Sequence, residues 1–201
     1  MIITSQDQLR ALYGEPNERA VNKVLGGFDK HVLHFISLSP FLAISTIDAD
    51  GNLDVSPRGG EPGFVKVIGN NELLIHDAKG NKRVDSLSNI VDTGFIGTLF
   101  FIPGVDEALR INGRATVSVD PTHLSLFERE ANPPKSCIHL VATQVFLHCA
   151  KALMRSKLWS AESQIERSIL PTMGEMMKDH LKLDTEPESR EEMLKRYAPD
   201  L

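Results

Sequence analysis

A series of short apolar segments separated by turn sequences occupies the middle of the chain and constrains its fold most strongly. The segments are rich in β-branched and aromatic residues, which is typical of strands. Turn residues such as Asp50-Gly51-Asn52 and Gly69-Asn70-Asn71 separate the first pairs as in hairpins. The predicted strands are residues 41–47, 53–56, 64–68, 72–76, 95–102, 108–119 and 137–148. Six or seven strands interrupted by one helix predict an antiparallel barrel. The run 95–102 is almost continuously apolar, so we expect that strand to be buried on both faces.

Amphipathic segments flank these strands at both ends of the chain. Capping residues and apolar positions three and four apart predict three short helices before residue 41. The second of these is expected to extend through Leu25 and to end at Gly26-Gly27. The chain after Cys149 is also expected to be mostly helical. There Lys151, Arg155 and Trp159 are spaced by four and would share one helical face. We therefore expect one domain, residues 1–201, with a helical lead-in (1–40), a barrel (41–148) and a helical tail (149–201).

The charge balance narrows the classes of partner. The chain has 201 residues, with 27 acidic and 22 basic side chains and a net charge of −5. A protein that binds nucleic acid as its main partner normally needs a basic face, so we do not expect nucleic acid here. The two cysteines allow at most one disulfide, and no apolar window approaches a membrane span. We expect a cytoplasmic protein with free thiols that does not bind a membrane.

Two cations stand at the start of the predicted mid-chain helix. Its apolar positions recur at offsets of three and four: Val84, Leu87, Ile90 and Val91. Just before it come Asn81, a capping-type residue, and the cations Lys82 and Arg83. A helix N-terminus offers unpaired N–H groups and the positive end of the macrodipole, so these cations destabilise the isolated helix slightly. A bound phosphate would reverse that effect. The alternative is a solvated loop with two surface cations.

Three further places could bind a ligand. The Arg of Ser56-Pro57-Arg58, beside two glycines, can approach a planar or anionic ligand closely, although an exposed turn would look the same. Arg110 projects on the same side of its strand as the Asn two positions on, and the alternative there is a solvated strand face. Lys151, Arg155 and Trp159 could cover an aromatic ring, or their cations could simply extend over the edge of the core.

Other kinds of site are not indicated. The pairs Cys137/His139 and His148/Cys149 lack the spacing of a zinc site, so a structural role is favoured and we expect no metal. The GxSxG, GxGxxG and GxxxxGK[ST] patterns are absent from the sequence. A serine hydrolase, a Rossmann site and a P-loop are therefore not expected.

Three of the motifs occur together in a known family. The chain resembles the pyridoxamine-5′-phosphate oxidase-like FMN-binding split β-barrel family, from about Phe41 to Val119 and on to Trp159. It is most similar to a bacterial branch with the motifs SPRG, PGN[KR]R and LR[IV]NG. Here these read Ser56-Pro57-Arg58-Gly59, Lys79-Gly80-Asn81-Lys82-Arg83 and Leu109-Arg110-Ile111-Asn112-Gly113. The resemblance implies a mainly β (α+β) fold, a six- to seven-stranded antiparallel split barrel with N- and C-terminal helices.

The resemblance also implies a homodimer that holds two FMN molecules in grooves between the subunits. Lys82 and Arg83 would hold the FMN phosphate, with Asn81 donating beside them. The strand end at Ser56-Pro57-Arg58 would lie along the isoalloxazine, and Ile75-His76-Asp77 would line the same groove. Other contacts would come from the partner subunit. The full implied set is Ser56, Pro57, Arg58, Ile75, His76, Asp77, Asn81, Lys82, Arg83, Leu109, Arg110, Lys151, Arg155 and Trp159.

Two departures from the true oxidase bear on the reaction. The strand motif RxVLLK is replaced by residues 56–61, and the C-terminal RLHDR-type segment is missing. Vitamin B6 oxidation is therefore not expected. We expect an FMN-dependent oxidoreductase of unspecified substrate, with Lys151 and Arg155 as candidates for stabilising reduced flavin. The alternatives are a flavin- or haem-binding module without turnover and a ligand-free dimeric scaffold.

Overall fold

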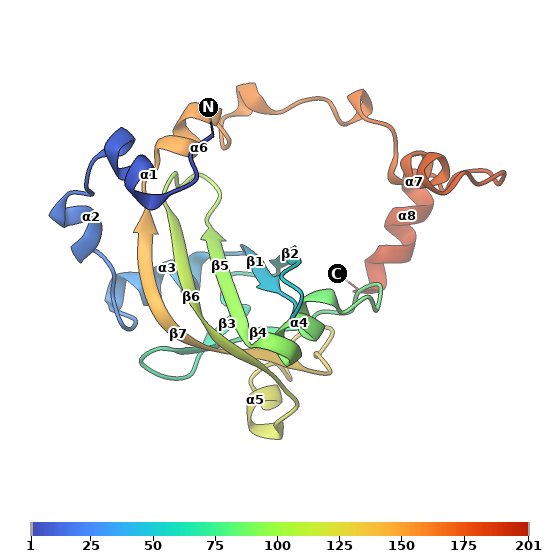
Figure 1. Cartoon of the computed structure of the whole chain (residues 1–201). Coiled ribbons are helices and arrows are strands. Elements are labelled where there is room, and N and C mark those ends of the chain that lie inside the picture. The colour runs from blue at the N-terminus through green and yellow to red at the C-terminus, as the bar shows by residue number, and fades with distance from the viewer. Residues whose placement is uncertain (1, 201) are drawn as a thin grey trace.

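Seven antiparallel strands form the body of the protein. The structure, a computed structural model, describes residues 2–200. The strands pair in the order β2-β1-β5-β6-β7-β4-β3 within one curved sheet (Figure 1). They are β1 (Phe41–Ile47), β2 (Leu53–Gly59), β3 (Val65–Val67), β4 (Glu72–His76), β5 (Phe95–Phe101), β6 (Ala108–Ser118) and β7 (Cys137–His148). In this order β2 and β3 are the two edge strands, so the barrel is split, and the predicted α+β split-barrel fold is confirmed.

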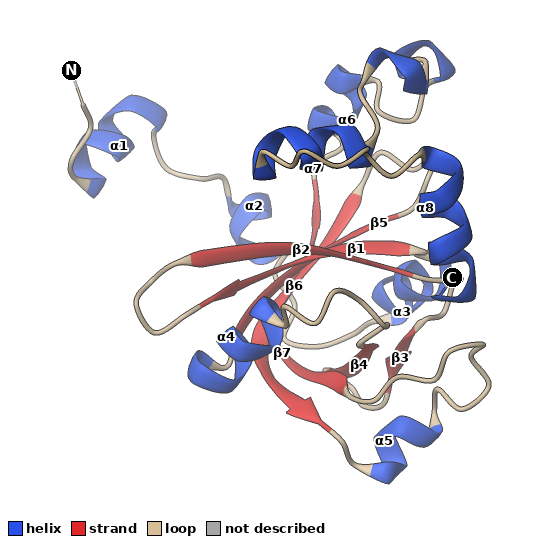
Figure 2. Cartoon of the chain, turned by 90° about the vertical axis from the view of Figure 1, so that its right-hand side faces the viewer, coloured by secondary structure: helices blue, strands red, loops and turns tan. Residues whose placement is uncertain are grey.

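Short helices precede, interrupt and follow the sheet (Figure 2). They are α1 (Gln6–Tyr13), α2 (Glu18–Asn22), α3 (Lys30–Leu38), α4 (Asp85–Thr93), α5 (Pro121–Ser125), α6 (Lys151–Ser156), α7 (Met173–Leu181) and α8 (Arg190–Tyr197), with 3₁₀ turns at Ala161–Ser163, Arg167–Ile169 and Ala198–Asp200. Ser5, Asn17 and Asp29 cap the three leading helices by accepting backbone N–H bonds. The second helix is shorter than predicted, because Leu25 leaves it to form an isolated β-bridge with Val145.

The core lies inside the curved sheet. The alternate residues of β1 and β6 that point inward are fully buried, among them Leu42, Ile44, Leu109 and Ile111. Ile36 of α3 and Ile90 of α4 belong to the same apolar cluster. These two helices therefore cover the inside of the barrel, and α4 is fixed where its N-terminal end can take part in a site.

The outer face of β1, β2 and β5 is apolar and open in the single chain. The expectation that the strand at 95–102 is buried on both faces is wrong for one protomer, since β5 alternates between buried and accessible residues. Phe95 is 54% exposed, and Leu53 and Val55 of β2 are 74% and 68% exposed. We call these three residues the open sheet face.

The last part of the chain stands away from the barrel. Residues 160–200, which we call the C-terminal arm, form an arch that leaves the barrel after α6 and comes back to it near residue 200 (Figure 1). None of the helices within residues 2–200 has both the length and the apolar character needed to cross a membrane.

Candidate functional site

A cleft of about 680 Å³ lies between the end of β2, the loop after β4, the start of α4 and the loop 132–135. Its volume is within the range of small-molecule sites. The residues that line this candidate cleft are Asp54, Ser56, Arg58, Asp77, Ala78, Lys79, Gly80, Asn81, Lys82, Arg83, Val84, Asp85, Ser86, Asn132, Pro133, Pro134 and Lys135. The structure thus brings together six of the predicted site residues: Ser56, Arg58, Asp77, Asn81, Lys82 and Arg83.

The pleat of β2 divides its residues between two surfaces. Successive side chains of a strand point to opposite faces, and Ser56 and Arg58 line the candidate cleft. Pro57, which we predicted beside them, is exposed on the other face together with Val55. The contribution of β2 to the cleft is therefore Asp54, Ser56 and Arg58, and Pro57 does not line it.

Arg58 is held in the cleft with part of its hydrogen-bonding capacity unused. One terminal nitrogen, Nη1, donates to Ser56 Oγ at 2.7 Å and to the Pro57 carbonyl oxygen at 3.1 Å. Its Nε is buried and finds no partner among residues 2–200. A buried guanidinium N–H without an acceptor is costly, so this group is suited to meet an oxygen or ring nitrogen of a ligand.

The mouth of α4 differs from its predicted form. The helix begins at Asp85, and Val84 is the N-cap residue, in a left-handed conformation with no side-chain cap in the described structure. Asn81 does not cap the helix, because its Oδ1 accepts the N–H of Arg83 at 3.0 Å. Val84 and Val91 are 51% and 73% exposed, so the predicted apolar face is wrong at both ends. The left-handed Val84 lies outside the helix, and Val91 points to solvent.

Backbone strain is concentrated in the same loop. Lys82 and Val84 have positive φ angles of 64° and 54°. The left-handed region is unfavourable for any β-branched residue, and such conformations persist mainly at ligand sites and switches. Together with the uncapped first turn of α4, this strain points to a loop shaped to present backbone N–H groups to an anion.

Cations outnumber carboxylates in the candidate cleft. Arg83 Nε donates to Asp85 Oδ2 at 2.8 Å, and Lys79 Nζ lies 2.6 Å from Asp200 Oδ1. Lys82 forms no ion pair within the described part of the chain. The five cations are Arg58, Lys79, Lys82, Arg83 and Lys135, against the carboxylates Asp54, Asp77 and Asp85. Five cations against three carboxylates leave a positive excess in the candidate cleft, and Asp54 accepts a hydrogen bond from the Ser86 hydroxyl.

Asp77 is the carboxylate of the cleft whose ionisation is most perturbed by burial. Removal of the carboxylate from water raises its pKa above the ordinary value of 3.8, and the positive charges of Arg58 and His76 oppose that shift only in part. The folded protein then holds the Asp77 proton more tightly than the unfolded chain. The contribution of Asp77 to stability therefore decreases as pH rises through the raised pKa.

We predict that Asp77→Asn raises the melting temperature at pH 7, because it removes a carboxylate that is costly to ionise in the cleft. The gain should shrink as pH falls through the raised pKa of Asp77 toward the ordinary value of 3.8, because the wild-type carboxyl is then protonated in the folded protein. Thermal melts of both proteins between pH 4 and pH 7 test this, with the exposed Asp92→Asn as a matched control. A gain that does not change with pH would contradict the assignment.

Three predicted residues lie inside the protein. Ile75 and Leu109 are fully buried in the main core, where they cannot line a groove. His76 lies between the rings of Phe64 and Phe127, and its Nδ1 is 2.5 Å from Glu130 Oε2. Both faces of β4 are covered, so Ile75 packs in the main core and His76 packs beside Phe127 on the opposite face, while Leu109 points inward from β6.

The remaining predicted residues lie outside the candidate cleft of the same chain. The guanidinium of Arg110 stacks 5.3 Å from the centre of the Phe146 ring. Lys151 and Arg155 are exposed on α6. Trp159 does not share their helical face, since α6 ends at Ser156 and the chain turns at the left-handed Lys157. The indole Nε1–H of Trp159 donates to the Val105 carbonyl at 2.9 Å.

Sequence reasoning missed several residues of the cleft. Asp54 could have been found, because it shares a strand face with Ser56 and Arg58. Asn132 and Lys135 gave no signal, because they come from the loop before β7 and only the pairing of β7 with β4 brings them close.

A split antiparallel barrel with a cation-rich candidate cleft at a helix mouth defines the class of the protein. The family model described as Pyridoxamine 5'-phosphate oxidase matches residues 28–149, which include the whole barrel. The chain therefore belongs to the pyridoxamine 5'-phosphate oxidase family.

Solved structures that resemble this chain are distant in sequence. HupZ of Group A Streptococcus is 14% identical, with 60% of this chain and 93% of that chain covered and a TM-score of 0.50. A candidate pyridoxamine 5'-phosphate oxidase from Lactobacillus delbrueckii is 19% identical over 61% of this chain and 95% of that one, with a TM-score of 0.47. No curated protein sequence matches the chain. At 14% identity the likeness to HupZ shows only the fold.

Proposed function

We propose that this protein binds FMN in the candidate cleft and acts as an FMN-dependent oxidoreductase. The observation that carries the proposal is the mouth of α4, where Lys82 and Arg83 precede a first helical turn whose N–H groups no side chain caps within residues 2–200. A phosphate dianion satisfies both kinds of group at once, through charge-assisted hydrogen bonds. Membership of the pyridoxamine 5'-phosphate oxidase family supports a flavin as the molecule that carries this phosphate.

The other residues of the cleft fit the rest of such a ligand. Arg58 has a buried Nε–H without an acceptor, beside the hydroxyl of Ser56, at the part of the cleft formed by β2. These groups can bind the polar edge of a flavin ring or the ribityl hydroxyls. The cavity of about 680 Å³ is large enough for a cofactor of that class.

We further propose a homodimer with the cleft at the subunit interface. The open sheet face, made of Leu53, Val55 and Phe95, lies on the reverse side of the strand that lines the cleft. Burial of this apolar surface against a second copy would be favourable, and a two-fold axis would pair it with itself. In that arrangement Arg110, Lys151, Arg155 and Trp159 of a partner would be the candidates to complete the groove.

FMN supplies the redox chemistry of such proteins when it is bound, through its capacity to accept and release electrons and hydride. The contribution of this chain is to hold the phosphate with Lys82 and Arg83, to orient the cofactor with Arg58, and to exclude water. The groove would then govern which substrate reaches the cofactor. The reaction would require no nucleophilic side chain.

The proposal is tested by the absorption spectrum of the purified protein, followed by titration with FMN. We expect a flavin spectrum, or saturable FMN binding, and loss of the flavin absorbance under nitrogen with a suitable member of a panel of reductants that includes NADH and NADPH. Colourless protein that does not bind added FMN would overturn FMN binding. Bound flavin that no reductant in the panel reduces would overturn the oxidoreductase assignment alone.

A further inference from the structure

The C-terminal arm is attached to its own barrel only near its two ends. At one end the Trp159 indole donates to the Val105 carbonyl. At the other end Asp200 pairs with Lys79, and Asn132 Nδ2 donates to the Pro199 carbonyl at 3.1 Å. Between these anchors, the hydrogen bonds and ion pairs of residues 161–198 in the described structure reach only residues from 157 onward. The body of the arm therefore makes no polar contact with the barrel it spans.

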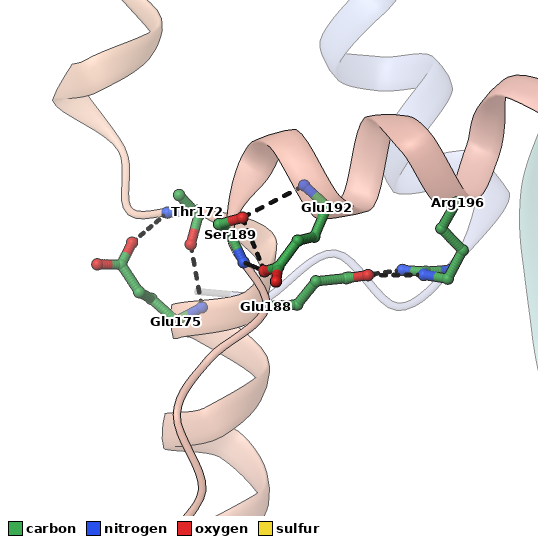
Figure 3. A network of polar contacts seen from close by, with 6 residues as sticks. All are labelled: Thr172, Glu175, Glu188, Ser189, Glu192 and Arg196. Atoms are coloured by element: carbon green, nitrogen blue, oxygen red, sulfur yellow. Dashed lines mark hydrogen bonds and ion pairs between the residues drawn. The ribbon is translucent and has the colours of Figure 1, made fainter.

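The arm is nevertheless a well-formed element. Both of its helices begin with a capping box, Thr172 with Glu175 on α7 and Ser189 with Glu192 on α8 (Figure 3). Glu188 accepts two hydrogen bonds of 2.7 Å from Arg196, and a Cβ on Gly174 would lie 2.1 Å from the Glu188 carbonyl. The caps of both helices are thus satisfied within the arm, and the start of α7 lies close to the residue that precedes the cap of α8.

The apolar side chains of the arm have no such partners. Met173, Met177 and Leu181 recur every four residues along one face of α7 and are 50%, 42% and 57% exposed. Ile169 and Leu170, just before this helix, are 66% and 54% exposed. A helix with satisfied caps and an exposed apolar stripe is typical of an interface whose other side is missing.

The position of the arm indicates what covers this stripe. Both views place the arm on the side of the barrel where β1, β2 and α4 lie (Figures 1 and 2). Leu53 and Val55 of the open sheet face belong to that same β2. The barrel and the arm thus each leave apolar side chains exposed in elements on this side of the protein. A second copy of this chain offers the same apolar strand face by symmetry, whereas α7 makes no polar contact with its own barrel in the described structure.

We infer that the C-terminal arm clasps a second copy of this chain, with the stripe Met173, Met177 and Leu181 packed on the partner's barrel. This inference rests on the homodimer of the proposed function and assigns the arm a role in it. The dimer then has two contact regions, the open sheet face and the reciprocal arms.

The inference is tested with Met177→Lys, which places a charge in the stripe, and Asp179→Lys, which places the same residue on the opposite face of α7. Dimer dissociation is measured by sedimentation velocity over a dilution series, with saturating FMN. A symmetric dimer contains this contact twice, so one substitution disrupts both copies. We therefore expect Met177→Lys to raise the dissociation constant roughly 100-fold and Asp179→Lys to leave it within about threefold. Equal dissociation constants for Met177→Lys and wild type would overturn the clasp and leave the dimer and its FMN site intact.

A second measurement detects the contact directly. Photocrosslinking from p-benzoyl-phenylalanine at position 177 is expected to give a product of twice the chain mass in the full-length protein. Crosslinks confined to one chain would show that the stripe packs on its own barrel and would overturn the inference. Wild-type protein that is monomeric at every concentration would overturn both the clasp and the homodimer, while FMN titration of the monomer reports separately on the cleft.

Discussion

The double variant Lys82→Ala/Arg83→Ala is expected to bind FMN at least 100-fold more weakly than the wild-type protein. Each charge-assisted hydrogen bond to the phosphate contributes about 1.5–3 kcal/mol. Arg83 must release Asp85 to bind the phosphate, and this exposed ion pair contributes at most about 1 kcal/mol. Binding of Arg83 to the phosphate is therefore favoured over its pairing with Asp85. Each tenfold change in affinity corresponds to about 1.4 kcal/mol. Quenching of FMN fluorescence in a titration measures the change.

Riboflavin, which lacks the phosphate, provides the sharpest control for this variant. Its affinity should be the same in the wild type and in Lys82→Ala/Arg83→Ala, because only the phosphate contacts have been removed. The pair Arg19→Ala/Lys30→Ala removes the same two residue types outside the candidate cleft and should bind FMN normally. An undiminished FMN affinity in the double cleft variant, or an equal loss for riboflavin, would show that the phosphate is not held at α4.

The fold was largely predictable because its signal is local. Alternation of apolar residues and hairpin turns placed all seven strands, with β1, β4 and β7 at the predicted bounds. The errors occur where a tertiary contact overrides the local pattern. Leu25 forms a β-bridge with Val145 and does not continue the predicted helix. Helix α6 ends at the left-handed Lys157, where the sequence has no glycine that would predict a helix end.

The site was predictable only in part, for the same reason. The cations and the polar loop before α4 were visible because they are contiguous in the chain. The strained φ of Val84 and the unpartnered Nε of Arg58 depend on packing, which no short motif encodes. A motif match also does not separate residues that contact a ligand from residues that the fold requires, and Leu109-Arg110-Ile111-Asn112-Gly113 illustrates this.

The motif at 109–113 is largely structural in this chain. Leu109 and Ile111 are fully buried, and the side-chain amide of Asn112 donates to Gln144 at 2.9 Å. The pairing of β6 with β7 shifts register between Asn112 and Gly113, as at a β-bulge. A Cβ on Gly113 would lie 2.1 Å from the Val141 carbonyl oxygen, which is backbone and cannot turn aside. Only glycine fits this close approach of two strands.

Gly113→Ala is therefore expected to destabilise the protein by about 3 kcal/mol, near the upper end of the usual cost of overpacking. For a chain of this size that corresponds to a fall in melting temperature of roughly 6–12 °C. Thermal and urea unfolding measure it, with Gly26→Ala as the control, because a Cβ at Gly26 meets nothing within 4 Å. Since Gly113 does not line the candidate cleft, FMN affinity measured well below the transition should stay within about threefold of wild type. A normal melting temperature with a large loss of FMN binding would reverse this conclusion and make the glycine a ligand-site residue.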